Sequence, residues 1–200
     1  IFLDITARRY FSFLINEFFL NFLKNAISES IPSLMNAVRM IHSISQYYNS
    51  SERMSSLFLK ITNQMINTCK KYIREGYTKV WEIPRSDLLV RIGECKRLFQ
   101  EYQKSFQKTR EKLKSMENER QWDFSENYIF GKFDAFCKRL DKIGDVINTI
   151  ESLSALNYVK LEGLEPIVVK YKSIVDSIRK KNYDILDHRK PDVIYLISNL

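Results

Sequence analysis

Glycine and proline are so sparse in this chain that long helices are the main structures open to it. The 200 residues include 5 Gly and 4 Pro, which leaves long stretches without a residue that favours a tight turn. Sandwiches, barrels and propellers depend on many tight turns, so this spacing argues against them. Apolar residues make up 44% of the chain, too many for a disordered protein. We therefore predict an all-α fold with a sizeable core.

Apolar residues recur at helical spacing from the beginning of the sequence. In residues 7–27 the apolar positions are separated alternately by three residues and by one, which predicts a helix with a wide apolar face. A Phe-rich face of this kind must be buried. We expect burial in the core, with a partner protein as the alternative. The face contains Phe11, Leu14, Ile15, Phe18, Phe19, Phe22 and Leu23.

Five further amphipathic helices follow, so the predicted fold is an elongated helical bundle, or two such bundles, of about six long amphipathic helices. A break is expected at residues 28–32, because Ser30 can cap the next helix and Pro32 suits its first turn. A connector at residues 118–125 carries Trp122, which we expect to be buried. The five helices are expected at residues 32–48, 51–76, 86–116, 125–150 and 166–185.

A connector at residues 77–84, ending in Pro84 and expected to be extended, separates two predicted segments. We predict a first helical bundle segment at residues 1–83 and a second at residues 84–192. Residues 193–200 form a C-terminal end that we assign to neither segment. Because the sequence starts at Ile1 rather than Met, we also expect the chain to be part of a longer protein.

The net charge of +8 is compatible with an acidic protein partner, an anionic surface or nucleic acid. Lys104, Lys108 and Lys112 share one helix face, and Arg110 and Lys114 lie beside them in the sequence. A phosphate backbone or an acidic subunit could bind such a stripe. Acidic residues run through the same segment, however, and a solvated, ion-paired helix is the simpler interpretation. These acidic residues are Glu101, Glu111, Glu117 and Glu119.

The residue types of an active site are almost absent. The two histidines, His42 and His188, have no neighbours at metal-ligand spacing. The glycines are too far apart for a phosphate-binding loop. We therefore predict no catalytic, cofactor-binding or metal-binding residues and no enzymatic activity in this chain. The three cysteines are isolated in apolar segments, which favours free thiols in a reducing compartment: Cys69, Cys95 and Cys137.

A membrane segment is not expected either. Arg8 and Arg9 precede an apolar stretch, as in a signal peptide. Asn16, Glu17 and Asn21 interrupt that stretch, so no window approaches the roughly 18–20 apolar residues that a membrane span needs.

One stretch carries a family pattern. Residues 122–156, WDFSENYIFGKFDAFCKRLDKIGDVINTIESLSAL, resemble a stretch in the N-terminal tail of dynein heavy chains, in which a Trp-aromatic pair precedes a helix of the form IF…FD.FC.RL..I. Residues 163–192 resemble the segment that follows in these tails, and residues 7–27 lie in the expected order upstream. The resemblance covers nearly the whole chain and is nearest to the axonemal outer-arm heavy chains. The matching positions are Trp122, Phe124, Ile129, Phe130, Phe133, Asp134, Phe136, Cys137, Arg139, Leu140 and Ile143.

The resemblance implies a non-catalytic piece of a minus-end-directed microtubule motor that drives ciliary and flagellar beating. ATP would be used in a downstream AAA ring, and this segment would hold no cofactor. In the family, the tail binds intermediate chains, light chains and adjacent heavy chains, and anchors the motor through docking machinery on doublet microtubules. The implied location is the cytoplasm and cytoskeleton, in the ciliary or flagellar axoneme.

Two features stand outside this resemblance. Residues 192–200, DVIYLISNL, differ from the Phe- and Asp-containing continuation expected in the family. Judged from the residues alone, the chain could also be a helical adaptor unrelated to motors, whose basic face binds acidic partners or nucleic acid. Such an adaptor would bind RNA or DNA with a steep salt dependence, whereas a tail segment would co-purify with other dynein chains and hydrolyse no ATP.

Overall fold

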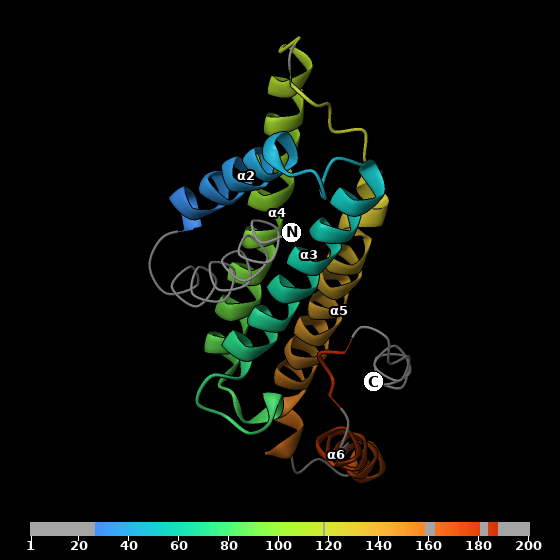
Figure 1. Ribbon diagram of the computed structural model, residues 1–200. Helices are drawn as coiled ribbons and strands as arrows, with labels where there is room; N and C mark the ends of the chain where they lie inside the picture. The colour runs from blue at the N-terminus through green and yellow to red at the C-terminus, as the bar shows by residue number, and fades with distance from the viewer. Residues whose placement is uncertain (1–26, 118, 159–162, 181–183, 188–200) are drawn as a thin grey trace. The chain divides into compact units, whose positions relative to one another are not determined.

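The computed structural model describes residues 27–117, 119–158, 163–180 and 184–187 (Figure 1). Within these ranges the regular elements are all helical and no strand is present, which confirms the all-α prediction. The Phe-rich face at residues 11–23 and the C-terminal residues 192–200 lie outside the described residues. The elements are α2 (Ile27–Ile44), α3 (Ser51–Arg74), η1 (Val80–Glu82), α4 (Arg85–Lys114), α5 (Glu126–Ser152), η2 (Ser154–Asn157) and α6 (Glu165–Arg179).

The chain folds into two compact units, each built from two separate stretches of sequence. The first unit comprises residues 1–72 and 93–134, and the second comprises residues 73–92 and 135–200. Helices α4 and α5 therefore contribute residues to both units. The sequence instead predicted two segments that follow one another along the chain, residues 1–83 and 84–192. That boundary stays a prediction.

An aromatic cluster forms the centre of the first unit. Phe58 of α3, Phe106 of α4 and Trp122 of the connector lie in mutual contact, with each pair of ring centroids 5.2 Å apart. Phe58 meets both partners edge-on, an arrangement worth about 0.5–1.5 kcal/mol per pair beyond simple burial. Trp122 is only 2% exposed, as the sequence predicted. The cluster therefore fixes the connector against α3 and α4.

A small polar network crosses the same unit. The Thr62 hydroxyl of α3 donates a hydrogen bond to the carbonyl oxygen of Ile129 in α5 at 3.1 Å and lies 3.5 Å from the hydroxyl of Tyr102 in α4. Thr62 and Tyr102 are fully buried, and burial raises the pKa of the Tyr102 hydroxyl well above its usual value. A buried hydroxyl needs its partner, so this network specifies how the three helices are aligned.

The second unit joins the C-terminal part of α5 to α6. Val146 and Ile178 are buried against each other, and Trp81, Ile150 and Ile174 pack around them. The Tyr171 hydroxyl of α6 donates a hydrogen bond to the carbonyl oxygen of Ile150 at 2.9 Å. Apolar burial and one directed hydrogen bond thus hold α6 to α5.

The described residues 184–187 form a short strap in the second unit. Arg139 of α5 is 5% exposed, and its Nε donates a hydrogen bond to the carbonyl oxygen of Ile185 at 2.7 Å. Asp184 forms an ion pair with Arg74 of α3 and accepts a hydrogen bond from the backbone N–H of Leu186. This is an Asx-type turn. Helix α6 ends at Arg179, earlier than the predicted end at residue 185.

The connection from α3 to α4 is built by residues 73–92. The Arg91 guanidinium donates hydrogen bonds to the carbonyl oxygens of Ile73 at 2.9 Å and Glu75 at 2.8 Å, and so caps the end of α3. Gly76 follows with φ +83°, the left-handed conformation that glycine adopts without strain. The predicted extended connector at residues 77–84 instead contains a turn of 3-10 helix, η1.

Helix α2 begins earlier and ends earlier than predicted. It runs through the expected break at residues 28–32 and holds Pro32 in its interior. Pro32 lies near the start of the helix and removes a single backbone hydrogen bond, while Ile31, Met35 and Val38 are buried on one face. Burial of that face outweighs the local preference for a break. The helix ends at Ile44, before a turn in which the Ser45 hydroxyl accepts hydrogen bonds from backbone N–H groups.

Replacing Trp122 tests whether the aromatic cluster holds the first unit together. We expect Trp122→Ala to lower the free energy of unfolding by about 3–5 kcal/mol, because it leaves a cavity between α3 and α4. Denaturant unfolding followed by circular dichroism measures the change. Tyr128→Ala is the control, because Tyr128 is 57% exposed and should change the free energy of unfolding by no more than about 0.5 kcal/mol. Equal effects of the two substitutions would contradict the role of the cluster.

Candidate functional site

The described residues contain no group of three His, Cys, Asp or Glu side chains placed to hold a metal ion. Cys69, Cys95 and Cys137 are free and buried. No helix in the described part of the chain is long and apolar enough to cross a membrane. Three features of the first unit are candidates for an interaction site.

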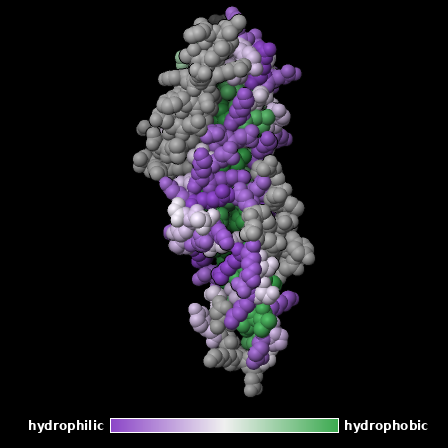
Figure 2. All heavy atoms as spheres, turned by 60° about the horizontal axis from the view of Figure 1, so that its bottom comes forward, coloured by the Kyte–Doolittle hydropathy of each residue, from purple (hydrophilic) through white to green (hydrophobic). Residues whose placement is uncertain are grey.

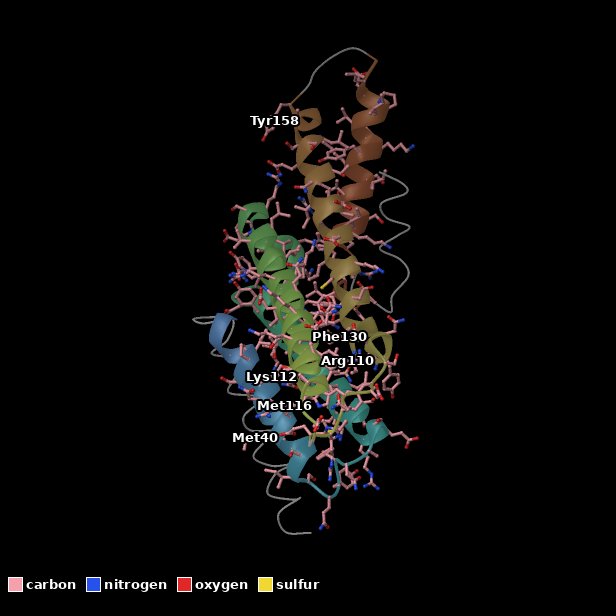
Figure 3. All side chains as sticks on the ribbon, turned by 90° about the horizontal axis from the view of Figure 1, so that it is seen from above. Met40, Arg110, Lys112, Met116, Phe130 and Tyr158 are labelled. Atoms are coloured by element: carbon pink, nitrogen blue, oxygen red, sulfur yellow. The ribbon has the colours of Figure 1, made fainter. Side chains whose placement is uncertain are left out.

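The first feature is the basic stripe formed by Lys104, Lys108 and Lys112 on α4. All three are exposed, and none pairs with a carboxylate among the described residues. Arg110, which the sequence placed beside them, is instead engaged with Glu126 of α5 at 2.8 Å. Figure 3 labels Arg110 and Lys112 on this part of α4. The basic field is thus smaller than the sequence suggested.

The second feature is the junction between α2 and the connector at 119–125. Arg120 donates a hydrogen bond to the carbonyl oxygen of His42 at 2.7 Å, which caps the end of α2. Arg39 pairs with Glu119 at 3.4 Å, and the His42 ring meets Phe124 edge-on at 5.8 Å. Burial lowers the pKa of His42, the positive charge of Arg120 lowers it further, and Glu119 acts in the opposite direction. His42 is therefore a structural residue of this junction.

The third feature is an exposed apolar stripe on α2 and the turn after it. Met40 is 54% exposed, Ile44 is 74% exposed and Tyr47 is 37% exposed. The sequence predicted a helix at residues 32–48, which would include Ile44, Tyr47 and Tyr48. The predicted end was wrong, because α2 ends at Ile44 and the Ser45 turn redirects the chain. Figure 3 labels Met40 on α2.

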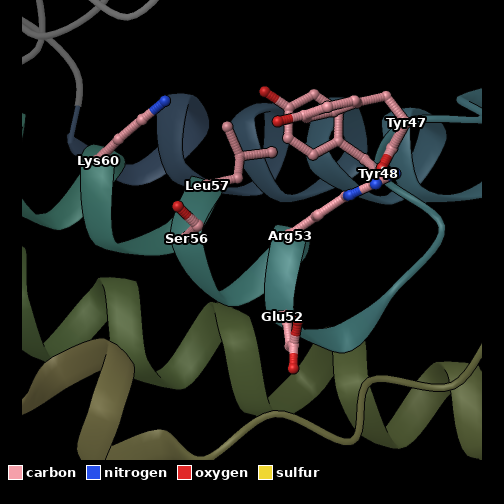
Figure 4. Close-up of a pocket in the computed structure, with 7 residues that line it drawn as sticks. All are labelled: Tyr47, Tyr48, Glu52, Arg53, Ser56, Leu57 and Lys60. Atoms are coloured by element: carbon pink, nitrogen blue, oxygen red, sulfur yellow. Dashed lines mark hydrogen bonds between the residues drawn. The ribbon is translucent and has the colours of Figure 1, made fainter.

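Tyr47 also belongs to a groove beside the start of α3 (Figure 4). The groove encloses about 140 Å³. The Arg53 guanidinium lies over the Tyr47 ring, 4.6 Å from its centroid, and donates a hydrogen bond to the Tyr47 carbonyl oxygen at 3.0 Å. Sequence reasoning missed this groove, since its residues come together only through the turn at 45–50. The lining residues are Tyr47, Tyr48, Glu52, Arg53, Ser56, Leu57 and Lys60.

The remaining visible surface is mainly hydrophilic. On the face shown in Figure 2, hydrophobic residues form small separate patches among hydrophilic ones.

Comparison with known proteins decides what kind of protein carries these surfaces. A family model described as dynein heavy chain, N-terminal region 1, matches residues 12–195. The chain belongs to this dynein heavy chain family. The resemblance found in residues 122–192 is thereby confirmed, and the alternative of an adaptor unrelated to motors is wrong. The match is to the non-catalytic N-terminal region of dynein heavy chains.

Several curated dynein heavy chains are similar over most of this chain. Dynein axonemal heavy chain 8 of Mus musculus is 48% identical over 168 residues, and dynein axonemal heavy chain 5 of Rattus norvegicus is 49% identical over 165 residues. The dynein gamma chain of the flagellar outer arm of Chlamydomonas reinhardtii is 35% identical over 165 residues. These matches cover 82–84% of this chain but 4–5% of each relative. The chain thus spans a small part of the length of these dyneins.

The burial of His42 predicts a pH dependence of stability for this dynein segment. The pKa of His42 in the folded chain lies below its usual value of 6.5, so the unfolded chain takes up the proton at a higher pH. Stability is therefore full above about pH 6.5 and falls as the pH drops below that value. The midpoint temperature of thermal unfolding should fall between about pH 7.5 and about pH 5.5, and it should fall less for His42→Gln than for the wild type. An identical change in both proteins would contradict this assignment.

Proposed function

We propose that the chain is a structural segment of an axonemal dynein heavy chain tail. In this role it binds intermediate chains, light chains and neighbouring heavy chains, and helps to anchor the motor to its cargo microtubule. The family match over residues 12–195 is the observation that carries the proposal. The proposed location is the ciliary or flagellar axoneme, which is the location named in the relatives' descriptions.

The fold supports a mechanical role. Helix α4 has 30 residues and α5 has 27, so each is more than twice the length of an average helix. At 1.5 Å per residue, α4 is about 45 Å long. In the first unit, α3, α4 and α5 are held by the aromatic cluster and the Thr62 network. Long helices packed along their sides transmit load with little deformation.

The proposed division of labour leaves ATP hydrolysis to another part of the heavy chain. The sequence carries no phosphate-binding loop, which supports a role in assembly for this segment. ATP would act in the motor ring of the parent protein, and no cofactor is proposed here. The surfaces of the first unit would receive the other subunits and the docking machinery on doublet microtubules.

Deletion in a full-length heavy chain tests the proposal. We expect an axonemal heavy chain without residues 27–187 to retain fewer intermediate and light chains in sucrose-gradient sedimentation, while its ATPase activity per molecule is unchanged. A full-length chain with Tyr128→Ala is the control and should keep its subunits. A deleted chain that holds every subunit, or one that loses its ATPase activity with the subunits in place, would contradict the assembly role.

Nucleic acid is not expected to be a partner. The basic stripe has three lysines, whereas a protein gains its affinity for a phosphate backbone from many contacts of this kind. We expect filter binding of a random RNA to be weak near 150 mM salt and to have a shallow salt dependence. Tight binding with a steep salt dependence that Lys104→Glu/Lys108→Glu/Lys112→Glu abolishes would contradict this expectation.

A further inference from the structure

The groove beside the start of α3 is built to receive an acidic group. Its positive residues are Arg53 and Lys60, and its negative residue is Glu52. Figure 4 shows that Glu52 points away from the side of α3 on which Arg53, Tyr47 and Tyr48 lie. Among the described residues that line the groove, its open side therefore presents the positive charges of Arg53 and Lys60.

Arg53 is held in place before any partner binds. Its guanidinium lies over the Tyr47 ring and donates a hydrogen bond from Nη1 to the Tyr47 carbonyl oxygen. A guanidinium has five N–H donors, and the hydrogen bond to the Tyr47 carbonyl oxygen uses one of them. A guanidinium fixed in this way binds a carboxylate through two parallel hydrogen bonds at a small cost in side-chain entropy.

The floor of the groove is apolar. Leu57 is 5% exposed and Tyr48 is 9% exposed, and the Tyr48 ring meets the Tyr47 ring edge-on at 4.9 Å. Tyr47 also ends the exposed apolar stripe that begins with Met40 and Ile44. Tyrosine and arginine around a small apolar floor are the residue types that dominate binding energy in protein interfaces.

We propose that this groove is the docking site for an acidic segment of another protein subunit. A partner carboxylate pairs with Arg53, the Lys60 ammonium lies near a second acidic residue, and apolar side chains of the partner cover Leu57 and the Met40–Tyr47 stripe. Charge complementarity selects the partner, because the two positive charges on an apolar floor favour a segment that carries both carboxylates and apolar residues. The inference deepens the proposed function, since it assigns one chemical class of partner to one surface of the tail.

Zero-length cross-linking of the assembled complex tests the proposal. A carbodiimide joins a lysine amine to a carboxylate with which it is in contact. In the native dynein complex we expect mass spectrometry to find Lys60 joined to Asp or Glu of another subunit. Lys71 is the matched control, because it is an exposed lysine on the same helix outside the groove, and it should give no such product.

Two variants show whether the cross-link depends on the groove. Arg53→Gln removes the paired charge and should lower the yield of the Lys60 cross-link by up to about fivefold, which corresponds to the upper range for an ion pair at a surface. Because Arg53 also contacts Tyr47, Ser56→Trp provides a second variant. Ser56 is exposed and lines the groove, so a tryptophan there blocks the groove without removing a described contact. It should lower the yield similarly, whereas Lys71→Glu should leave it unchanged.

The outcomes separate this inference from the proposed function. Lys60 joined only to acidic residues of its own chain, or to none in the intact complex, would overturn the groove as a site for a partner subunit. A nucleic-acid occupant would also give no cross-link, because it offers no carboxylate. Retention of every subunit by the chain without residues 27–187 would instead contradict the proposed assembly role. A Lys60 cross-link that both variants leave unchanged would overturn the role of Arg53 and the groove.

Discussion

The contact among Phe58, Phe106 and Trp122 is the constraint on which the first unit depends. It joins two helices to a connector that has no regular structure of its own. Once Trp122 is buried, the residues on either side of it are held close to α2, where Arg120 caps the helix and Phe124 meets His42. The end of α2, the Ser45 turn and the groove beside α3 therefore depend indirectly on one indole ring. Burial of aromatic area supplies the energy, and the directed hydrogen bonds then select one arrangement.

Much of this fold could be predicted because its signals are periodic. The apolar spacing of α4 and α5 repeats over seven or eight turns, so a mistake at one position changes little. Trp122 was predicted to be buried because it is a large aromatic residue in an otherwise mostly polar connector. The ends of α2 were harder, because burial of Ile31 and Met35 overrides the break that Pro32 suggests. The strap at residues 184–187 was missed because its contacts with Arg139 and Arg74 cross long sequence separations.

The groove shows why a binding surface was harder to predict than the fold. Tyr47 and Tyr48 continue the apolar period of α2, and a helix through residue 48 would have placed them inward. With the turn made by Ser45, Tyr48 is still buried, whereas Tyr47 is exposed and lies under Arg53. The basic stripe on α4 was visible in the sequence, but the pairing of Arg110 with Glu126 was not. The charge of a surface depends on which charged side chains are left after ion pairs have formed within the protein. Those ion pairs follow from the tertiary structure.

The strap at residues 184–187 also bears on the mechanical role proposed for this part of the tail. Ile185 and Leu186 are buried, and the buried Arg139 guanidinium holds the Ile185 carbonyl oxygen. A pull on the chain beyond Asp187 therefore acts on the side of α5 before it reaches α6. The ion pair of Asp184 with Arg74 passes part of that pull to the end of α3. The contacts of the strap thus lead to two different helices, α5 and α3, so under the proposed mechanical role both would share a load applied to it.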